Sequence, residues 1–135
     1  MKRFLTTHYS AGSLNASMLL LRISFGALMM KHGYDKMVHF SDYKATFMNF
    51  MEIGKTASLS IVIFAEFFCA LFVIIGLFTR LNVIPLVVVM GVALFKSHHG
   101  DFMGEGESAA LYLTAFTALL LVGPGKISVD GLISK

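Results

Sequence analysis

The chain alternates between long apolar stretches and short polar segments, and the stretch lengths predict helices that cross a membrane. The clearest stretch covers residues 57–78, where Glu66 is the only charged residue. At about 1.5 Å per residue, a helix of that length crosses a hydrocarbon core of roughly 30 Å. Further apolar stretches cover residues 15–34, 81–97 and 107–122. We therefore expect an all-α integral membrane protein, a four-helix bundle forming a single domain over residues 1–135.

The connection between the first two stretches has a helical pattern of its own. Phe40, Tyr43, Phe47, Phe50 and Met51 recur at helical spacing, with charged and amide residues between them. This pattern predicts a short amphipathic helix over residues 40–53 that lies in the membrane interface.

Two details of the third and fourth stretches predict local structure. The third helix should begin near residue 82, with Pro85 in its first turn, where a missing N–H costs little. Ala110, Thr114 and Ala118 form a ridge of small residues at four-residue spacing. Such ridges let helices approach closely in lipid.

Composition supports the membrane assignment and excludes several classes of function. Hydrophobic residues make up 56% of the chain and charged residues 14%, whereas soluble domains carry about 25% charged residues. The sequence has no basic stripe with interleaved aromatic residues, so we expect no nucleic-acid partner. Cys69 is the only cysteine, which excludes an intrachain disulfide or a Cys-x-x-Cys redox pair. Redox chemistry would therefore need a bound cofactor or a partner protein.

Four crossings place both termini and the turn at Arg80 on one side of the membrane. Basic residues divide evenly between the two sides, so the positive-inside rule does not decide the orientation. Six of the seven acidic residues outside the spans lie on the side opposite the termini. This distribution favours termini in the cytoplasm.

Arg22 and Glu66 lie inside predicted spans, where ionisable groups face a partner or a water-filled cavity. Their positions along antiparallel helices differ by roughly 6 Å in depth, at 1.5 Å per residue, so we expect the two side chains to pair. The pair has two interpretations. It is either structural, fixing how the first two helices meet, or part of a site that binds a polar headgroup or relays a proton.

A second group of polar residues should gather at the end of the bundle opposite the termini. It comprises His32, Lys36, His98, His99, Glu105 and Glu107, and the sequence leaves open which histidine and which glutamate of the last four matter. Histidine beside carboxylate suits a proton relay or a hydrogen bond to a quinone carbonyl, and the alternative is an ordinary polar rim. Adjacent residues on a helix point about 100° apart, so His98 and His99 do not form a metal pair, and no metal is expected.

In order and spacing, these segments resemble the DoxX family of small bacterial membrane proteins. The resemblance covers residues 20–132. It rests on Leu-Leu-Arg at 20–22, Lys-His-Gly-Tyr-Asp-Lys at 31–36, Glu66, Gly-Leu-Phe-Thr-Arg at 76–80, the histidines at 98–99 and Gly-Pro-Gly-Lys-Ile-Ser-Val-Asp at 123–130. It implies a multi-pass protein of the bacterial inner membrane. It also implies a link to redox chemistry, because the family is named with a subunit of thiosulfate:quinone oxidoreductase. By the same resemblance, Arg80 and Asp130 are structural, and we expect them to form an ion pair.

Three hypotheses of function follow. The first is an accessory or quinone-linked component of membrane redox chemistry, an oxidoreductase subunit if it is an enzyme at all. It would bind an amphipathic ligand such as quinone near Arg22, Glu66, His32 and the histidines at 98–99, and a partner protein would supply electrons. The second is a non-catalytic scaffold or assembly factor, with a homo-oligomer among its possible forms. The third, a transporter of small organic anions, is disfavoured by the absence of broken helices unless the chain oligomerises.

Overall fold

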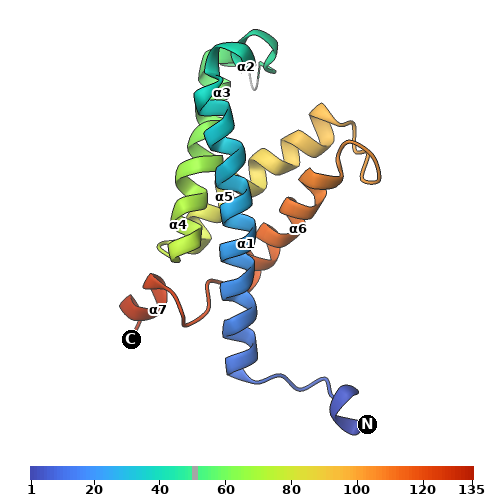
Figure 1. The fold of residues 1–135 in the computed structure, drawn as a ribbon, viewed down its shortest axis with the longest axis vertical. Helices are drawn as coiled ribbons and strands as arrows, with labels where there is room; N and C mark the ends of the chain where they lie inside the picture. Colours follow the sequence, from blue (N-terminus) through green and yellow to red (C-terminus); the bar gives the residue numbers. More distant parts are fainter. Residues whose placement is uncertain (50–51) are drawn as a thin grey trace.

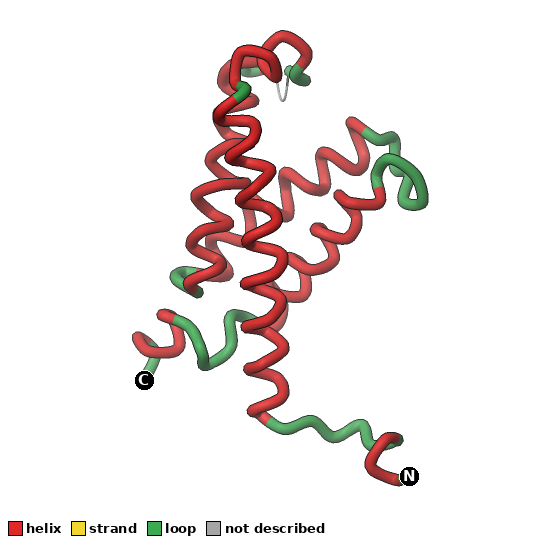
Figure 2. Tube along the Cα trace, viewed as in Figure 1, coloured by secondary structure: helices red, strands yellow, loops and turns green. Residues whose placement is uncertain are grey.

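The structure is a computed structural model that describes residues 1–49 and 52–135 (Figures 1 and 2). Within that part of the chain, the regular secondary structure is entirely helical, as the sequence predicts. In chain order the elements are η1 (Lys2–Phe4), α1 (Ala11–Val38), α2 (Phe40–Thr46), α3 (Lys55–Ile63), η3 (Phe64–Cys69), α4 (Ala70–Ile75), α5 (Thr79–Val92), η4 (Ala93–Ser97), α6 (Glu107–Val122) and α7 (Val129–Ile133).

The first long helix, α1, extends further at both ends than the apolar pattern indicates. It begins after Ser10, whose side chain accepts a hydrogen bond from the Ser13 amide at 3.0 Å, a typical N-cap. It continues to Val38 instead of ending near residue 34. The glycine in the polar segment 31–36 does not stop the helix, because Gly33 lies on the buried face and contacts the next helix.

The second long helix is continuous over Lys55–Ile75 but has a wide π turn, η3, in its middle. It ends three residues before the predicted boundary at residue 78. Gly76 takes a left-handed conformation (φ 75°, ψ 37°). The amides of Gly76 and Leu77 then bond to the carbonyls of Val73 and Phe72 at 3.1 and 3.0 Å, which is the usual glycine-dependent helix ending.

The third long helix, Thr79–Ser97, begins earlier than the sequence indicates and ends in a second π turn, η4. Pro85 therefore lies inside α5, in its second turn, and the prediction that it occupies the first turn is wrong. The early start has a distant cause, since the Asp130 carboxylate accepts hydrogen bonds from the amides of Phe78 and Thr79. A proline at this position removes one helical hydrogen bond.

The C-terminal segment after α6 is not an extended tail but contains a short helix that packs against the turn between α4 and α5. Helix α6 has the predicted bounds, Glu107–Val122, and ends at Gly123. The following loop leads to α7, and the Asp130 amide donates to the Gly76 carbonyl at 2.8 Å. This contact joins the C-terminal segment to the turn between α4 and α5.

The amphipathic segment between the first two long helices is only partly helical. Helix α2 covers Phe40–Thr46, and residues 47–49 leave the helical conformation. Phe50 and Met51, which the prediction also includes, lie outside the described residues. Tyr43 fixes α2 against the end of α1 by donating a hydrogen bond to the Asp35 carboxylate at 2.6 Å, and this bond raises the pKa of Tyr43.

The long helices pack closely at the end that carries the termini and diverge at the other end (Figure 1). Helix α1 packs on α4 and η3, and α5 packs on α6. Three of the described helices are long and apolar enough to cross a membrane, namely Ala11–Val38, Lys55–Ile75 and Thr79–Ser97. Helix α6 is apolar but shorter, with 16 residues.

Glycines set the close approach of α1 to the second helix. A methyl group at Gly33 would come within 2.7 Å of the Phe67 amide nitrogen, and one at Gly26 within 3.3 Å of the Ala70 carbonyl oxygen. Backbone atoms cannot yield as a flexible side chain can. The close approach of the two helices therefore favours glycine at both positions, most strongly at Gly33.

This contact predicts a large effect for one methyl group. We expect Gly33→Ala to lower the free energy of unfolding by about 1–3 kcal/mol through overpacking, measured by thermal or chemical unfolding in mild detergent. Gly91→Ala is the matched control, because nothing lies within 4 Å of a methyl group there. It should leave stability unchanged or raise it by up to about 1 kcal/mol. Equal effects of the two changes would contradict the close approach.

Candidate functional site

An ion pair between the first two long helices lies at the diverging end of the bundle. Lys36 comes from the last turn of α1 and Glu66 from η3, and Lys36 Nζ lies 2.5 Å from Glu66 Oε2. The side chains are only 18% and 4% exposed. Gly33, one turn before Lys36, allows this pairing because it brings α1 against the backbone at Glu66.

Arg22 does not pair with Glu66, so the expected Arg22–Glu66 contact is wrong. Its guanidinium is buried and donates to four backbone carbonyls of the described chain. Nε and Nη2 bond to the carbonyls of Val73 and Ile74 at 3.0 Å each, and Nη1 bonds to those of Pro124 and Ile127 at 2.8 and 2.7 Å.

The physical reason for this arrangement is the early end of the second helix. The last carbonyls of a helix have no helical N–H partner and carry partial negative charge. Val73 and Ile74 lie in that last turn because α4 ends at Ile75. Arg22 satisfies the Ile74 carbonyl and is a second donor to the Val73 carbonyl, which also accepts from the Gly76 amide. Lys36, not Arg22, is the partner of Glu66.

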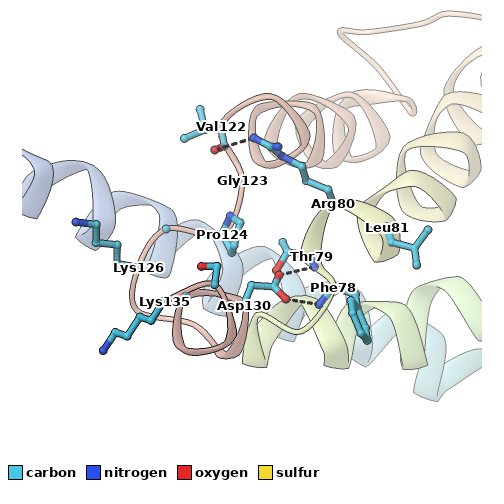
Figure 3. A pocket seen from close by; sticks show the side chains of 13 residues that line it. Phe78, Thr79, Arg80, Leu81, Val122, Gly123, Pro124, Lys126, Asp130 and Lys135 are labelled. Carbon is cyan, nitrogen blue, oxygen red and sulfur yellow. Dashed lines mark hydrogen bonds between the residues drawn. The ribbon is translucent and has the colours of Figure 1, made fainter.

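The Arg80 guanidinium points toward Val122 and Asp130 toward Phe78 and Thr79, so each bonds to backbone and the expected ion pair does not form (Figure 3). Asp130 accepts from the amides of Phe78 and Thr79 at 2.7 and 2.8 Å. Arg80 Nη2 donates to the carbonyl of Val122 at 3.3 Å. Burial alone would raise the pKa of Asp130. The amide hydrogen bonds and the positive charge of Arg22 outweigh that effect and hold the pKa below its ordinary value.

The predicted polar group at the other end of the bundle is only partly assembled. His98 Nδ1 lies 3.9 Å from Glu105 Oε2, too far for a hydrogen bond, and it has no hydrogen-bond partner among the described residues. The His32 ring makes an edge contact with Tyr112, with ring centres 5.9 Å apart. His99 and Glu107 are exposed.

A cavity of about 580 Å³ joins the Lys36–Glu66 pair to His98. Its walls are mostly apolar residues of two long helices, with a few polar side chains among them. The lining comprises Lys36, Thr46, Phe47, Met48, Ile61, Val62, Glu66, Ile84, Pro85, Val88, Val89, Val92, Ala93, Ser97 and His98. Arg22, His32, His99 and Glu107 do not line it. Pockets for small ligands usually measure about 300–1,000 Å³, so the cavity has a suitable size.

The chemistry of this cavity suits a polar head on an apolar body. Lys36 has three N–H donors and Glu66 has four acceptor positions, while their direct contact uses one of each. The remaining groups can donate to a carbonyl and accept from a hydroxyl. The pair is neutral as a whole, and the surrounding walls are apolar, so a low local dielectric strengthens these hydrogen bonds.

Arg22 and Lys36 were expected in a site, but the inward face of α1 that carries them was not identified from the sequence. Arg22, Gly26, Met29, Gly33 and Lys36 recur every three or four positions along α1 and form its inward face. That spacing was present in the sequence, but the polar run at 31–36 was interpreted as a helix end. The π turns at Glu66 and before His98 have no comparable sequence signal.

Comparison with known proteins identifies a family. The sequence model of the DoxX family matches residues 17–99, which is more than half of the chain. The match includes Lys36, Glu66 and His98 but ends before α6. No curated protein and no solved structure shows significant similarity to the chain. The family match and the apolar helices together establish a membrane protein in contact with lipid.

The contacts of Arg22 and Glu66 predict two different mutant cycles. Glu66→Met alone should lower the free energy of unfolding by about 3–5 kcal/mol, because Lys36 is left buried and unpaired. Adding Lys36→Met should restore most of that loss. If Arg22→Met is combined with Glu66→Met instead, the loss of unfolding free energy in the double variant should equal the sum of the two single losses within about 0.5 kcal/mol, because Arg22 and Glu66 share no contact. Chemical unfolding in detergent measures both cycles. Strong coupling of Arg22 with Glu66 would contradict the structure.

The hydrogen bonds of Asp130 predict a pH dependence of stability. Its folded-state pKa lies below the ordinary value of 3.8, so its contribution is complete well above that value. The contribution is lost as the pH falls through 3.8 and then through the folded-state pKa. Asp130→Asn should be less stable at neutral pH and should lose less stability on acidification. Melting temperatures measured from pH 7 to pH 3 test this, and parallel curves for the two proteins would contradict it.

Proposed function

Because the chain belongs to the DoxX family of membrane proteins, we propose that it binds a lipid-soluble molecule with a polar head in the cavity beside Lys36 and Glu66. The carrying observation is a buried ion pair at the edge of an apolar cavity of about 580 Å³ between two long apolar helices. A structural pair alone does not require such a cavity. An amphipathic ligand accounts for both the apolar walls and the polar end.

A quinone is the ligand that we propose. Its carbonyl oxygens are acceptors for the free Lys36 N–H groups, and a reduced quinone hydroxyl is a donor to Glu66. His98, which also lines the cavity, offers a second polar residue from the other helix pair. The chain itself carries a single cysteine, so we propose that a partner protein supplies the electrons and that this protein is an accessory component of membrane redox chemistry.

The membrane arrangement that we propose has four crossings, with α6 as the fourth. Its 16 residues span about 24 Å at 1.5 Å per residue, which a locally thinned bilayer or the polar flanks can accommodate. Its packing on α5 supports this arrangement. Four crossings leave both termini on one side, in agreement with Figure 1. We further propose the bacterial inner membrane and cytoplasmic termini.

Retention of the ligand through purification tests the proposal. Mass spectrometry of lipid-soluble molecules that copurify in mild detergent should detect a quinone with the natural protein. The Lys36→Met, Glu66→Met variant should lose it, because the polar contacts are gone while no charge is left unpaired. Lys31→Met is the control, since Lys31 is exposed on the same helix and lies outside the cavity. Equal retention of the quinone by all three proteins would contradict a binding site at Lys36 and Glu66.

Binding of an added quinone gives an independent test. A short-chain quinone at about 100 times its dissociation constant should stabilise the natural protein by about 2.7 kcal/mol. The doubly substituted variant should show no such shift at the same concentration. No shift for either protein, together with no copurified quinone, would reject a quinone as the ligand.

A scaffold or assembly role is the second candidate, and one observation favours it. The ridge of Ala110, Thr114 and Ala118 lies off the buried face of α6, with Thr114 exposed and its hydroxyl bonded to the Ala110 carbonyl at 2.8 Å. Small residues on an open face suit contact with another membrane helix, in a partner or a second copy. Loss of a stoichiometric partner on Thr114→Phe would support this role, and unchanged copurification would oppose it.

A further inference from the structure

A second cavity, of about 690 Å³, lies at the opposite end of the bundle. It is formed where α5 begins and where the loop after α6 passes α7 (Figure 3). Three cationic side chains line it, those of Arg80, Lys126 and Lys135. This cavity shares no lining residue with the cavity at Lys36 and Glu66.

The acidic side chains among the described lining residues neutralise only part of the positive charge of this cavity. Asp130 is the acidic side chain in the lining, and its two oxygens accept the amide hydrogen bonds of Phe78 and Thr79. The ion pairs between described residues lie elsewhere in the bundle. The side chains lining the cavity therefore carry two positive charges in excess.

The guanidinium of Arg80 contacts two backbone carbonyls and keeps other N–H donors free. Its Nη2 atom bonds to the carbonyls of Leu121 and Val122 at 3.4 and 3.3 Å. The same nitrogen lies 3.3 Å from where a methyl group at Gly123 would be, so a glycine leaves room for it. Nε and Nη1 make no hydrogen bond to the described residues. An exposed guanidinium that is oriented by two long contacts and keeps free donors suits bidentate binding of a phosphate.

The position of the cavity along the helices indicates the source of the phosphate. Apolar α5 begins here and apolar α6 ends here, so the cavity lies at the level of lipid headgroups. Phe78 and Leu81 line it and are 61% and 67% exposed, beside any acyl chain. We propose that Arg80 binds the phosphate of an anionic phospholipid in this cavity.

The two lysines have a different role from that of Arg80. Figure 3 shows that Lys126 and Lys135 extend away from Arg80 on the other side of the loop. They act as positive charges at the rim, which favour a lipid with net negative charge over a zwitterionic one. Basic residues near a membrane surface attract anionic lipids in this way.

Native mass spectrometry of the full chain in mild detergent tests the site. The probes are phosphatidylglycerol and phosphatidylcholine with identical acyl chains. The natural protein should bind phosphatidylglycerol more tightly. Arg80→Gln should weaken that binding at least about tenfold, because it removes charge-assisted hydrogen bonds to the phosphate. Each rim lysine contributes less, up to about fivefold for each of Lys126→Gln and Lys135→Gln. Lys2→Gln with Arg3→Gln, a pair of equal charge outside the cavity, is the control and should bind as the natural protein does.

Three outcomes would overturn the proposal. The first is equal affinity of the natural protein for the two lipids. The second is equal weakening by the lysine pair and the control pair, which indicates surface charge without a site. The third is displacement of the lipid by inorganic phosphate at equal concentration, which indicates a free anion as the ligand. If Arg80→Gln lowers the melting temperature, the comparison rests on Arg80→Lys, which keeps the charge but not the bidentate donors and should still bind phosphatidylglycerol more weakly. Unchanged binding by the Arg80 variant would also overturn the proposal.

Discussion

The burial of Arg22 is the constraint on which the arrangement of the helices depends. A guanidinium inside an apolar bundle is costly unless its donors are satisfied. Its four carbonyl acceptors come from the end of α4 and from the loop after α6. Those carbonyls lie where helices have ended and can accept hydrogen bonds from a side chain, although the Val73 carbonyl also accepts from the Gly76 amide. One side chain thus joins α1, the second helix and the C-terminal loop, and Asp130 adds the start of α5.

The opposite end of the bundle has a different character, because the buried ion pair described there joins α1 to η3 and not to α5 or α6. Gly33 holds α1 against η3, and the Lys36–Glu66 pair follows from that contact. The pair α5–α6 diverges from there, which leaves the apolar cavity between the two groups of helices (Figure 1). A π turn lies on each side of this gap, at Glu66 and just before His98. Such turns occur often at functional sites.

The sequence predicted elements better than contacts, and the reasons are physical. Apolar length identified the long helices, and the bounds of α6 were correct because Gly123 ends it plainly. The partners of Arg22 could not be predicted, since they are backbone carbonyls that become available only where distant helices end. The start of α5 depends on Asp130, 51 residues away. Similar depths along the helix axes suggested that Arg22 would pair with Glu66. The contacts of Arg22 depend instead on which way its helix face points and on where the second helix ends.

The cavity beside Glu66 opens sideways, because Ile61, Ile84 and Val88 line it and are also 46–49% exposed on the flank of the bundle. A molecule that reaches it through this flank comes from the hydrocarbon phase and not from water. Each additional buried methylene raises partitioning into the bilayer by about 0.8 kcal/mol, without touching the protein. An affinity calculated from the aqueous ligand concentration would then increase with tail length simply because longer tails partition more strongly into the bilayer. The selectivity of the protein itself would appear only in affinities calculated from the mole fraction of ligand in the bilayer.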